Sequence, residues 1–593
     1  MKPIVLILLI SFTLYNCSNQ PAAPHSTNTK SEAFAALLEE YSEDGLKLYP
    51  LMATYNGDDR YNDYLPNYLS DEFKAAEKAY YTTYLERLDS FKTEDLTEEE
   101  QMSKAVLEWE CNINLEALNY PTDLTPIDQM WTLQLSVAQL ASGDGAQPFE
   151  TVEDYNNWLS RLDDYLVWLA AAKEKMQEGI ATGYVLPKSL IVKIIPQFEV
   201  MANTALEDHL FYQPIIQLPE SFTSAEKDSL TKAYQSIVEE KVIPAYKDIL
   251  DFFTEEYLPA GRTSSGIADV PGGKDYYDFT IKHYTTTEMT ADEIYELGLA
   301  EVDRIMVEMK KVKDQVAYEG DMRSFFDYVR NSKELMPFTT GEEVIDNYKM
   351  IHEKMKPYLP KLFDLTPKTP FEVRRVEAYR EASGSAEYHQ GSKDGSRPGI
   401  FYVPVPNPET YNVLYDEALF LHEAIPGHHY QVSLTLENDQ LPEFRKNIWY
   451  SAYGEGWALY TESLGKELGL YTDPYQYLGM LTMEMHRAIR LVVDPGMHVK
   501  GWTREEAIQY SLDNEPEFEH IIIADVERYM ALPGQALSYK IGQLKIMELR
   551  AKAEATLGDR FDIRQFHNEI LATGCIPLAL LEKKINEWIE GQK

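Results

Sequence analysis

A proline and a glycine interrupt a short stretch of the chain that is rich in histidine. Residues 422–429 read His-Glu-Ala-Ile-Pro-Gly-His-His. Proline has no amide N–H to donate to the carbonyl four residues earlier, and its ring clashes with that carbonyl, so a straight helix does not continue through Pro426. Gly427 adds backbone freedom at the next position. The sequence therefore predicts a break or bulge between His422 and His428.

The histidines and the glutamate of this stretch indicate a metal site with altered spacing. In the common H-E-x-x-H motif, two histidines on one helical face bind zinc, and the glutamate beside them acts as general base. Histidines six positions apart on a straight helix would be about 9 Å apart along its axis, too far to share one ion. A chain that folds back at the break allows His428 to take the place of the second ligand beside His422, with Glu423 as the base.

Glu455 is the best candidate for a third ligand. It lies 32 residues beyond Glu423, between Gly454 and Gly456, which allow close approach of the backbone. Two histidines and one glutamate, with the fourth position left to water, form a known catalytic zinc arrangement. Glu462 follows seven residues later on nearly the same helical face and is expected to orient a ligand. One zinc ion is inferred from the ligand types, and another divalent ion is the alternative.

Each of these residues also has a purely structural explanation. Isolated His-Glu pairs occur by chance, and Pro-Gly is commonly a simple turn. However, the chain has only 12 histidines, and three of them fall within eight residues beside a glutamate. This concentration favours metal binding over a buried hydrogen-bonded network.

The stretch H-E-A-I-P-G-H-H-Y-Q resembles the hallmark of the bacterial family DUF885. The similarity spans most of the chain beyond the leader. Further matching segments are 454–460, 487–494, 496–498, 501–503, 533–542 and 566–578. The family in turn resembles helical, gluzincin-like zinc metallopeptidases in which H-E-x-G-H is followed by a glutamate ligand. Aligning the two Gly-His pairs selects His428 as the ligand, so His429 is expected to pack or hydrogen-bond nearby. The resemblance implies a reaction class more than a substrate.

In such an enzyme the zinc would polarise the scissile carbonyl and acidify a water, while Glu423 would transfer the proton to the leaving amine. The tetrahedral oxyanion needs hydrogen-bond donors. Three candidates lie in the C-terminal segments, and each has a packed, structural role as its alternative: His498, Tyr529 and Tyr539. Three basic side chains could bind the terminal carboxylate of a peptide: Arg487, Arg490 and Lys540. Such side chains more commonly lie on the surface or form structural ion pairs.

The sequence therefore predicts a zinc-dependent peptidase that acts on peptides or small proteins in the cell envelope. Two other classes stay open: a non-catalytic, lipid-anchored peptide-binding protein that keeps the metallopeptidase-like fold, and a structural lipoprotein. The intact Glu423 argues against pure binding, because binding requires no base. Endopeptidase and exopeptidase action are equally compatible with the motif.

The N-terminus predicts export. Residues 1–17 combine a charged start with an apolar stretch too short to span a bilayer, which is typical of a secretory leader. The leader ends at Cys17, which predicts lipidation of that cysteine, although the two residues before it are not the usual small ones and leave a plain secretory leader open. Residues 18–33 are expected to form a flexible tether, and residues 34–593 one helical metallopeptidase-like domain.

Charge and cysteine content restrict the partners. A net charge of −42 disfavours nucleic acid and anionic membrane surfaces. The expected partners are a peptide substrate and, through the N-terminal lipid only, the membrane, while the oligomeric state is left open. A disulfide between Cys111 and Cys575, the two cysteines other than Cys17, is also left open.

Helical signals dominate the chain, so the fold is expected to be mainly α, a large helical domain with a small β-sheet near the active site. Capping boxes, in which a threonine is followed three residues later by a glutamate, precede periodic segments at Thr97, Thr290 and Thr503. Strands are expected at 371–376 and 400–403. In the peptidases that the chain resembles, a strand beside the metal helix pairs with extended substrate.

Overall fold

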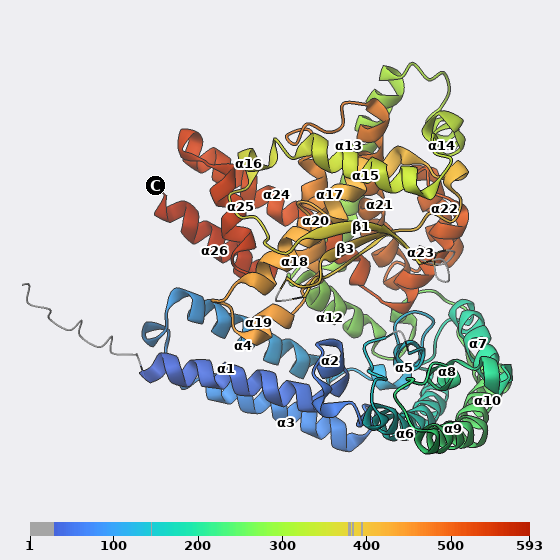
Figure 1. The fold of residues 1–593 in the computed structure, drawn as a ribbon. Coiled ribbons are helices and arrows are strands. Elements are labelled where there is room, and N and C mark those ends of the chain that lie inside the picture. Colours follow the sequence, from blue (N-terminus) through green and yellow to red (C-terminus); the bar gives the residue numbers. More distant parts are fainter. Residues whose placement is uncertain (1–28, 144, 378–380, 382–384, 393–394, 593) are drawn as a thin grey trace, which may run out of the picture.

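The computed structural model describes residues 29–592 except 144, 378–380, 382–384 and 393–394 (Figure 1). This part of the chain is mainly helical and contains a small three-stranded sheet, so the expected fold class is confirmed. None of its helices combines the length and the apolar character needed to cross a membrane. The predicted leader, with Cys17, lies outside the described residues. The predicted tether is too long at its C-terminal end, because the first helix already begins at Thr29.

Helices α1 to α11, between Thr29 and Ala260, form two groups, which Figure 1 shows along the lower side of the molecule. The first group consists of α1 (Thr29–Leu48), α2 (Pro50–Tyr55), α3 (Asp71–Leu88) and α4 (Glu98–Ala117). The second consists of α5 (Leu133–Ala141), α6 (Val152–Thr182), α7 (Lys188–Asn203), α8 (Gln213–Ile216), α9 (Ser224–Ile237), α10 (Ile243–Phe252) and α11 (Leu258–Ala260). The second group has a hydrophobic core of its own, around Trp158, Tyr165 and Phe253. The region expected as one domain therefore contains more than one hydrophobic core.

The remaining helices share one large core with α1, α3 and α4. They are α12 (Gly273–Thr285), α13 (Ala291–Gln315), α14 (Met322–Asn331), α15 (Gly341–Met355), α16 (Leu359–Leu362), α17 (Asp416–Glu423), α18 (His428–Glu437), α19 (Glu443–Asn447), α20 (Ser451–Ser463), α21 (Pro474–His498), α22 (Arg504–Asn514), α23 (Glu519–Ala531), α24 (Ser538–Leu557), α25 (Ile563–Leu571) and α26 (Leu578–Gly591). Helix α13 packs along α21, and α20 along α24. The second pair approaches so closely that a Cβ at Gly542 would lie 1.8 Å from the carbonyl oxygen of Ala452.

The sheet has the strand order β1 (Phe371–Arg375), β3 (Gly399–Val403), β2 (Glu387–His389). Strands β1 and β3 are parallel, with Phe371 opposite Gly399, and β2 is antiparallel to β3. Both strands expected from the sequence are therefore confirmed, whereas β2 was not expected.

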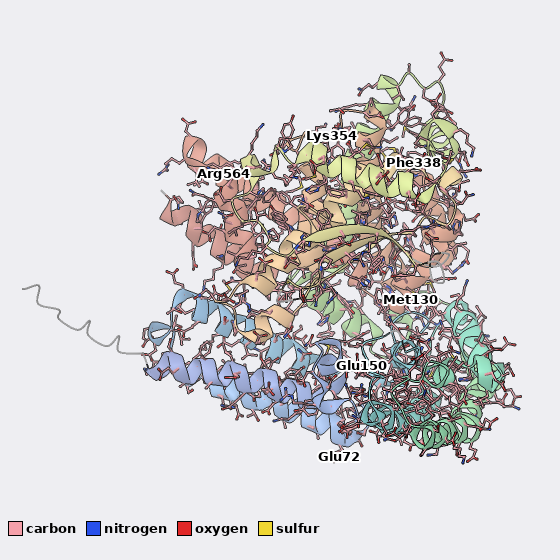
Figure 2. The ribbon with its side chains drawn as sticks, in the orientation of Figure 1. Glu72, Met130, Glu150, Phe338, Lys354 and Arg564 are labelled. Atoms are coloured by element: carbon pink, nitrogen blue, oxygen red, sulfur yellow. The ribbon has the colours of Figure 1, made fainter. Side chains whose placement is uncertain are left out.

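The sheet is connected to the central helices through α15, which contacts both β1 and α17. Lys354 of α15, labelled in Figure 2, forms an ion pair with Glu417 of α17 at 2.8 Å. This contact fixes the N-terminal end of α17 in the middle of the molecule.

The expected capping boxes are confirmed at the starts of α4, α13 and α22, where Thr97, Thr290 and Thr503 each bond reciprocally with the glutamate three residues on. These local bonds satisfy amide groups that the first helical turn leaves free.

Candidate metal centre

The helix that carries His422 breaks where the proline predicts. Helix α17 ends at Glu423 and α18 begins at His428, with a cis peptide bond between Ile425 and Pro426 in the turn. A Cβ at Gly427 would lie 1.9 Å from the carbonyl oxygen of His422, so only glycine permits this close return of the chain.

A neighbouring helix holds the turn in place. The indole N–H of Trp457 on α20 donates to the carbonyl of Pro426 at 2.9 Å, and the hydroxyl of Thr461 donates to the carbonyl of Leu421 at 2.8 Å. Leu421 is in the last turn of α17, where carbonyls have no intrahelical partner, and Pro426 lies in the turn that follows the helix. The same helix carries Glu455 and Glu462, so its docking also sets the positions of both carboxylates.

The break brings the predicted ligands together. Glu455 Oε2 lies 3.5 Å from Nε2 of His422 and 3.5 Å from Nε2 of His428. One ligand atom each of His422, Glu423 and His428 also lie within 4.8 Å of one another. All four side chains are buried or nearly so, with Glu455 the most accessible at 17%.

The spacing of these atoms fits a tetrahedral metal ion. A separation of 3.5 Å is long for a hydrogen bond between nitrogen and oxygen. Tetrahedral ligands bound at roughly 2.0–2.2 Å are themselves about 3.3–3.6 Å apart, which matches both His–Glu separations. The donor set of two imidazoles and one carboxylate is also one that catalytic zinc uses.

Glu462 orients His422 from behind. Its Oε1 lies 2.7 Å from Nδ1 of His422, which directs Nε2 toward Glu455 and His428. Metal-binding histidines are typically held by such a carboxylate on the other ring nitrogen. Burial opposes a charge on His422, but Glu455 and Glu462 together raise its pKa to about 9. The site therefore attracts positive charge strongly. Nδ1 of His428, in contrast, is buried without a partner among the described residues.

Glu423 lies beside the cluster, and no residue in the described part of the chain forms an ion pair with it. Burial raises the pKa of its carboxyl group above the ordinary value, while the neighbouring histidines act to lower it. A carboxylate whose affinity for a proton is raised in this way suits a general base.

His429 points to a different environment from His428. Its Nδ1 lies 3.0 Å from the hydroxyl of Tyr388 and 3.3 Å from that of Ser433, and its ring packs against Phe371 of the sheet. Burial lowers the pKa of His429 to about 4, so the ring is neutral at neutral pH.

The structure argues against the predicted role of His498 as an oxyanion donor. Its Nδ1 accepts from the amide of Ile267 at 3.1 Å, and its Nε2 bonds the carbonyl of Tyr529 at 3.0 Å. Both ring nitrogens are therefore used by the backbone, and burial lowers the pKa of the ring to about 3. The hydroxyl of Tyr529, the second candidate, accepts from Nε of Arg490 at 3.0 Å and belongs to an arginine network.

Tyr539 is the candidate whose hydroxyl senses the charge of a predicted ligand, Glu455. Burial raises the pKa of its hydroxyl, and Glu455 raises it further. The guanidinium carbon of Arg490 lies 4.7 Å from the centre of the Tyr539 ring.

Sequence reasoning missed Trp449, whose half-exposed ring lies 5.9 Å from that of His428. A single tryptophan in a loop gave no signal of this position.

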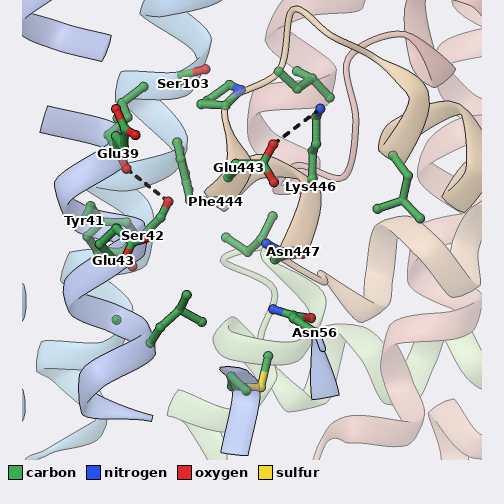
Figure 3. Close-up of a pocket in the computed structure, with 18 of the residues that line it drawn as sticks. Glu39, Tyr41, Ser42, Glu43, Asn56, Ser103, Glu443, Phe444, Lys446 and Asn447 are labelled. Atoms are coloured by element: carbon green, nitrogen blue, oxygen red, sulfur yellow. Dashed lines mark hydrogen bonds and ion pairs between the residues drawn. The ribbon is translucent and has the colours of Figure 1, made fainter. Parts of the chain in front are cut away.

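A cavity of about 930 Å³ lies between α1, α2 and α4 on one side and α19 on the other. Figure 3 shows Glu39, Tyr41 and Glu43 of α1 facing Glu443 and Phe444 of α19 across it. Its lining extends to residue 448, directly before the tryptophan that contacts His428. None of the cluster residues is part of its lining.

Cys111 and Cys575 are both buried and both free, so the disulfide left open by the sequence is not formed.

Fold and site define a large helical protein with a buried His-Glu cluster at a helix break. The chain belongs to the bacterial family DUF885, described as bacterial protein of unknown function, whose sequence profile matches residues 50–585. Among solved structures, it is similar to "the putative lipoprotein from Colwellia psychrerythraea", with 28% identity, a TM-score of 0.85 and coverage of 95% of this chain and 99% of that one.

A second solved structure, "a putative lipoprotein of unknown function from Shewanella oneidensis", shares 19% identity with a TM-score of 0.69, over 93% of this chain and 99% of that one. At this identity the likeness shows the fold alone. A comparison with curated proteins finds no match. Neither structural relative is named for an activity, so any enzymatic role rests on the site itself.

Proposed function

We propose that this protein is a zinc-dependent peptidase that hydrolyses peptides or small proteins in the cell envelope. The observation that carries the proposal is the convergence of His422, His428 and Glu455 at separations that fit a tetrahedral ion. Glu423, which such a set of ligands does not need, lies directly beside them. An unused carboxylate next to a metal site supports catalysis rather than binding alone.

His422, His428 and Glu455 would hold one zinc ion, and Glu462 would keep His422 in the required tautomer. When bound, such an ion supplies a Lewis acid that polarises a carbonyl and lowers the pKa of water. Zinc is proposed from the ligand types, and the same geometry is compatible with other divalent ions of similar preference.

Side chains of the protein would carry out the proton transfers. The carboxylate of Glu423 would accept a proton from the attacking water and deliver it to the nitrogen of the leaving amine. Its raised pKa supports the delivery step, because a more basic carboxylate holds the proton until the amine takes it. Tyr539 remains the candidate donor to the oxyanion, since His498 is occupied by backbone groups.

Export and anchoring form part of the proposal. Similarity to a protein described as a lipoprotein supports lipidation at Cys17. Cys17→Ala should move the protein from the membrane fraction to the soluble envelope fraction, and mass spectrometry of the mature N-terminus should show loss of the lipid. Unchanged membrane partitioning would contradict this part.

Glu423→Gln tests the catalytic proposal. It should retain metal and fold but lose about 10²–10⁴-fold in turnover of a mixed peptide library followed by mass spectrometry. The matched control is Glu505→Gln on the surface, where the glutamate side chain is 75% exposed. Near-normal hydrolysis by Glu423→Gln, or a metal-loaded wild-type protein that cleaves no peptide, would reject the proposal.

A further inference from the structure

Two arginines one turn apart on α21 present hydrogen-bond donors without acceptors. In Arg487, Nε is buried with no partner, and in Arg490, Nη1 is buried with no partner, among the residues that the structure describes. The backbone spacing of three residues places both side chains on neighbouring positions of one helical face.

The other guanidinium nitrogens of Arg490, Nε and Nη2, have partners that hold the group in place. Nε donates to the hydroxyl of Tyr529 at 3.0 Å, and Nη2 lies 3.0 Å from Nε2 of His486 and 3.9 Å from Oδ1 of Asp525. The residue is only 6% exposed. These contacts fix the plane of the guanidinium group and leave Nη1 as the donor without a partner.

Arg487 has no carboxylate partner in the described part of the chain. The bond found for it is a donation from Nη1 to the carbonyl of Met483, one turn earlier, at 3.3 Å. This is unusual in a chain with 97 acidic and 55 basic residues. A partly buried cation with unsatisfied donors beside a second cation is costly unless an anion completes the site.

Helix α21, which carries both arginines, packs against α17 and α20, the helices that carry His422, Glu423 and Glu455. The guanidinium carbon of Arg490 lies 4.7 Å from the centre of the Tyr539 ring. Glu455 raises the pKa of the Tyr539 hydroxyl, whereas Arg490 lowers it. Arg487 is close enough that its charge lowers the pKa of Glu423. Lys540, the third cation considered from the sequence, bonds Glu484 at 2.7 Å and Glu301 at 2.9 Å and is therefore committed to structure.

We propose that Arg487 and Arg490 bind the C-terminal carboxylate of the peptide and so make the enzyme a carboxypeptidase that removes a single residue or a short C-terminal fragment. This inference rests on the proposed peptidase function. The planar carboxylate would accept charge-assisted hydrogen bonds from the two unused edges. The amide C–N bond near the C-terminus breaks, the water oxygen bonds the acyl carbon, and the amine nitrogen takes the proton.

The test compares peptides that differ only at the C-terminus, a free acid against its amide, each with a free and with an acetylated N-terminus. The wild type should prefer the free acid by about 10–100-fold in kcat/KM, the value of hydrogen bonds to a charged group. Arg487→Met, which keeps much of the apolar stem, should lose that preference. Arg323→Ala, at a 69% exposed surface ion pair, is the matched control and should retain it.

A binding measurement separates this inference from the proposed function. Zinc-loaded Glu423→Gln should bind the free acid about 10–100-fold more tightly than the amide in calorimetry, and Glu423→Gln combined with Arg487→Met should not. Equal hydrolysis of acid and amide would leave a peptidase but overturn the carboxylate site, as would a requirement for a free N-terminus. Acid-selective binding without hydrolysis by the wild type would support the carboxylate site while rejecting the peptidase.

Discussion

Gly427→Ala tests the helix break that brings the proposed metal ligands together. A Cβ at this position would lie 1.9 Å from the carbonyl oxygen of His422 and 2.3 Å from that of Leu421. Because contacts below 3.0 Å are essentially never tolerated, α17 and α18 must separate by about 1 Å, which exceeds the roughly 0.2 Å within which metal–ligand distances are held. The imidazoles of His422 and His428 would then no longer reach one ion.

The expected result is a loss of zinc affinity of about 10–100-fold, the range that follows when a ligand is no longer held in position. Overpacking should also destabilise the fold by about 1–3 kcal/mol. Competition with a chromogenic chelator measures the first effect and thermal unfolding the second. Gly591→Ala is the control, because its added methyl group would meet nothing within 4 Å. Zinc affinity equal to that of the wild type in Gly427→Ala would refute the close-return geometry of the break.

Three further outcomes are expected. Glu462→Ala should lower zinc affinity by about 10–100-fold, because His422 loses the carboxylate on its Nδ1, and a chelator titration checks this. Tyr539→Phe should lower kcat by about 10²–10³ at unchanged metal content, as expected for the loss of one oxyanion donor in a peptide-hydrolysis assay. Burial raises the pKa of Asp494 to about 7, against bonds from Tyr277 and Gly534 that act to lower it. Its neutral form therefore stabilises the fold below about pH 4, the range of an unfolded aspartate, and this contribution is lost as the pH rises to about 7. Asp494→Asn should flatten the corresponding part of a plot of melting temperature against pH.

The sequence was most informative where a local steric rule applies. Pro426 lacks an amide hydrogen, so the end of α17 and the return of the chain toward His422 could be predicted. The capping box at Thr97 and the strand at 371–376 follow from similarly local signals. The proximity of Glu455 to both histidines depends on how α20 docks, and the glycines that flank it were the signal available in the sequence.

Other features depend on contacts between distant segments and left little trace in the local sequence. The backbone of Ile267, more than two hundred residues away, occupies His498, so a histidine in a family-like motif has a structural role. Strand β2 is only three residues long and exists because β3 offers it an edge. The separate core of α5–α11 was not predicted because its apolar stripes look the same as those of the main body.

Metal stoichiometry after dialysis tests the central claim most directly. Wild-type protein should retain one zinc ion per chain, measured by inductively coupled plasma mass spectrometry. The His429→Ala variant should retain most of its zinc, because the ring of His429 bonds Tyr388 and is not a proposed ligand. His422→Ala and His428→Ala should each lose the ion while keeping the helical circular dichroism spectrum. A wild-type protein without stoichiometric metal, or a His428→Ala variant that stays loaded while His429→Ala is empty, would contradict the assignment.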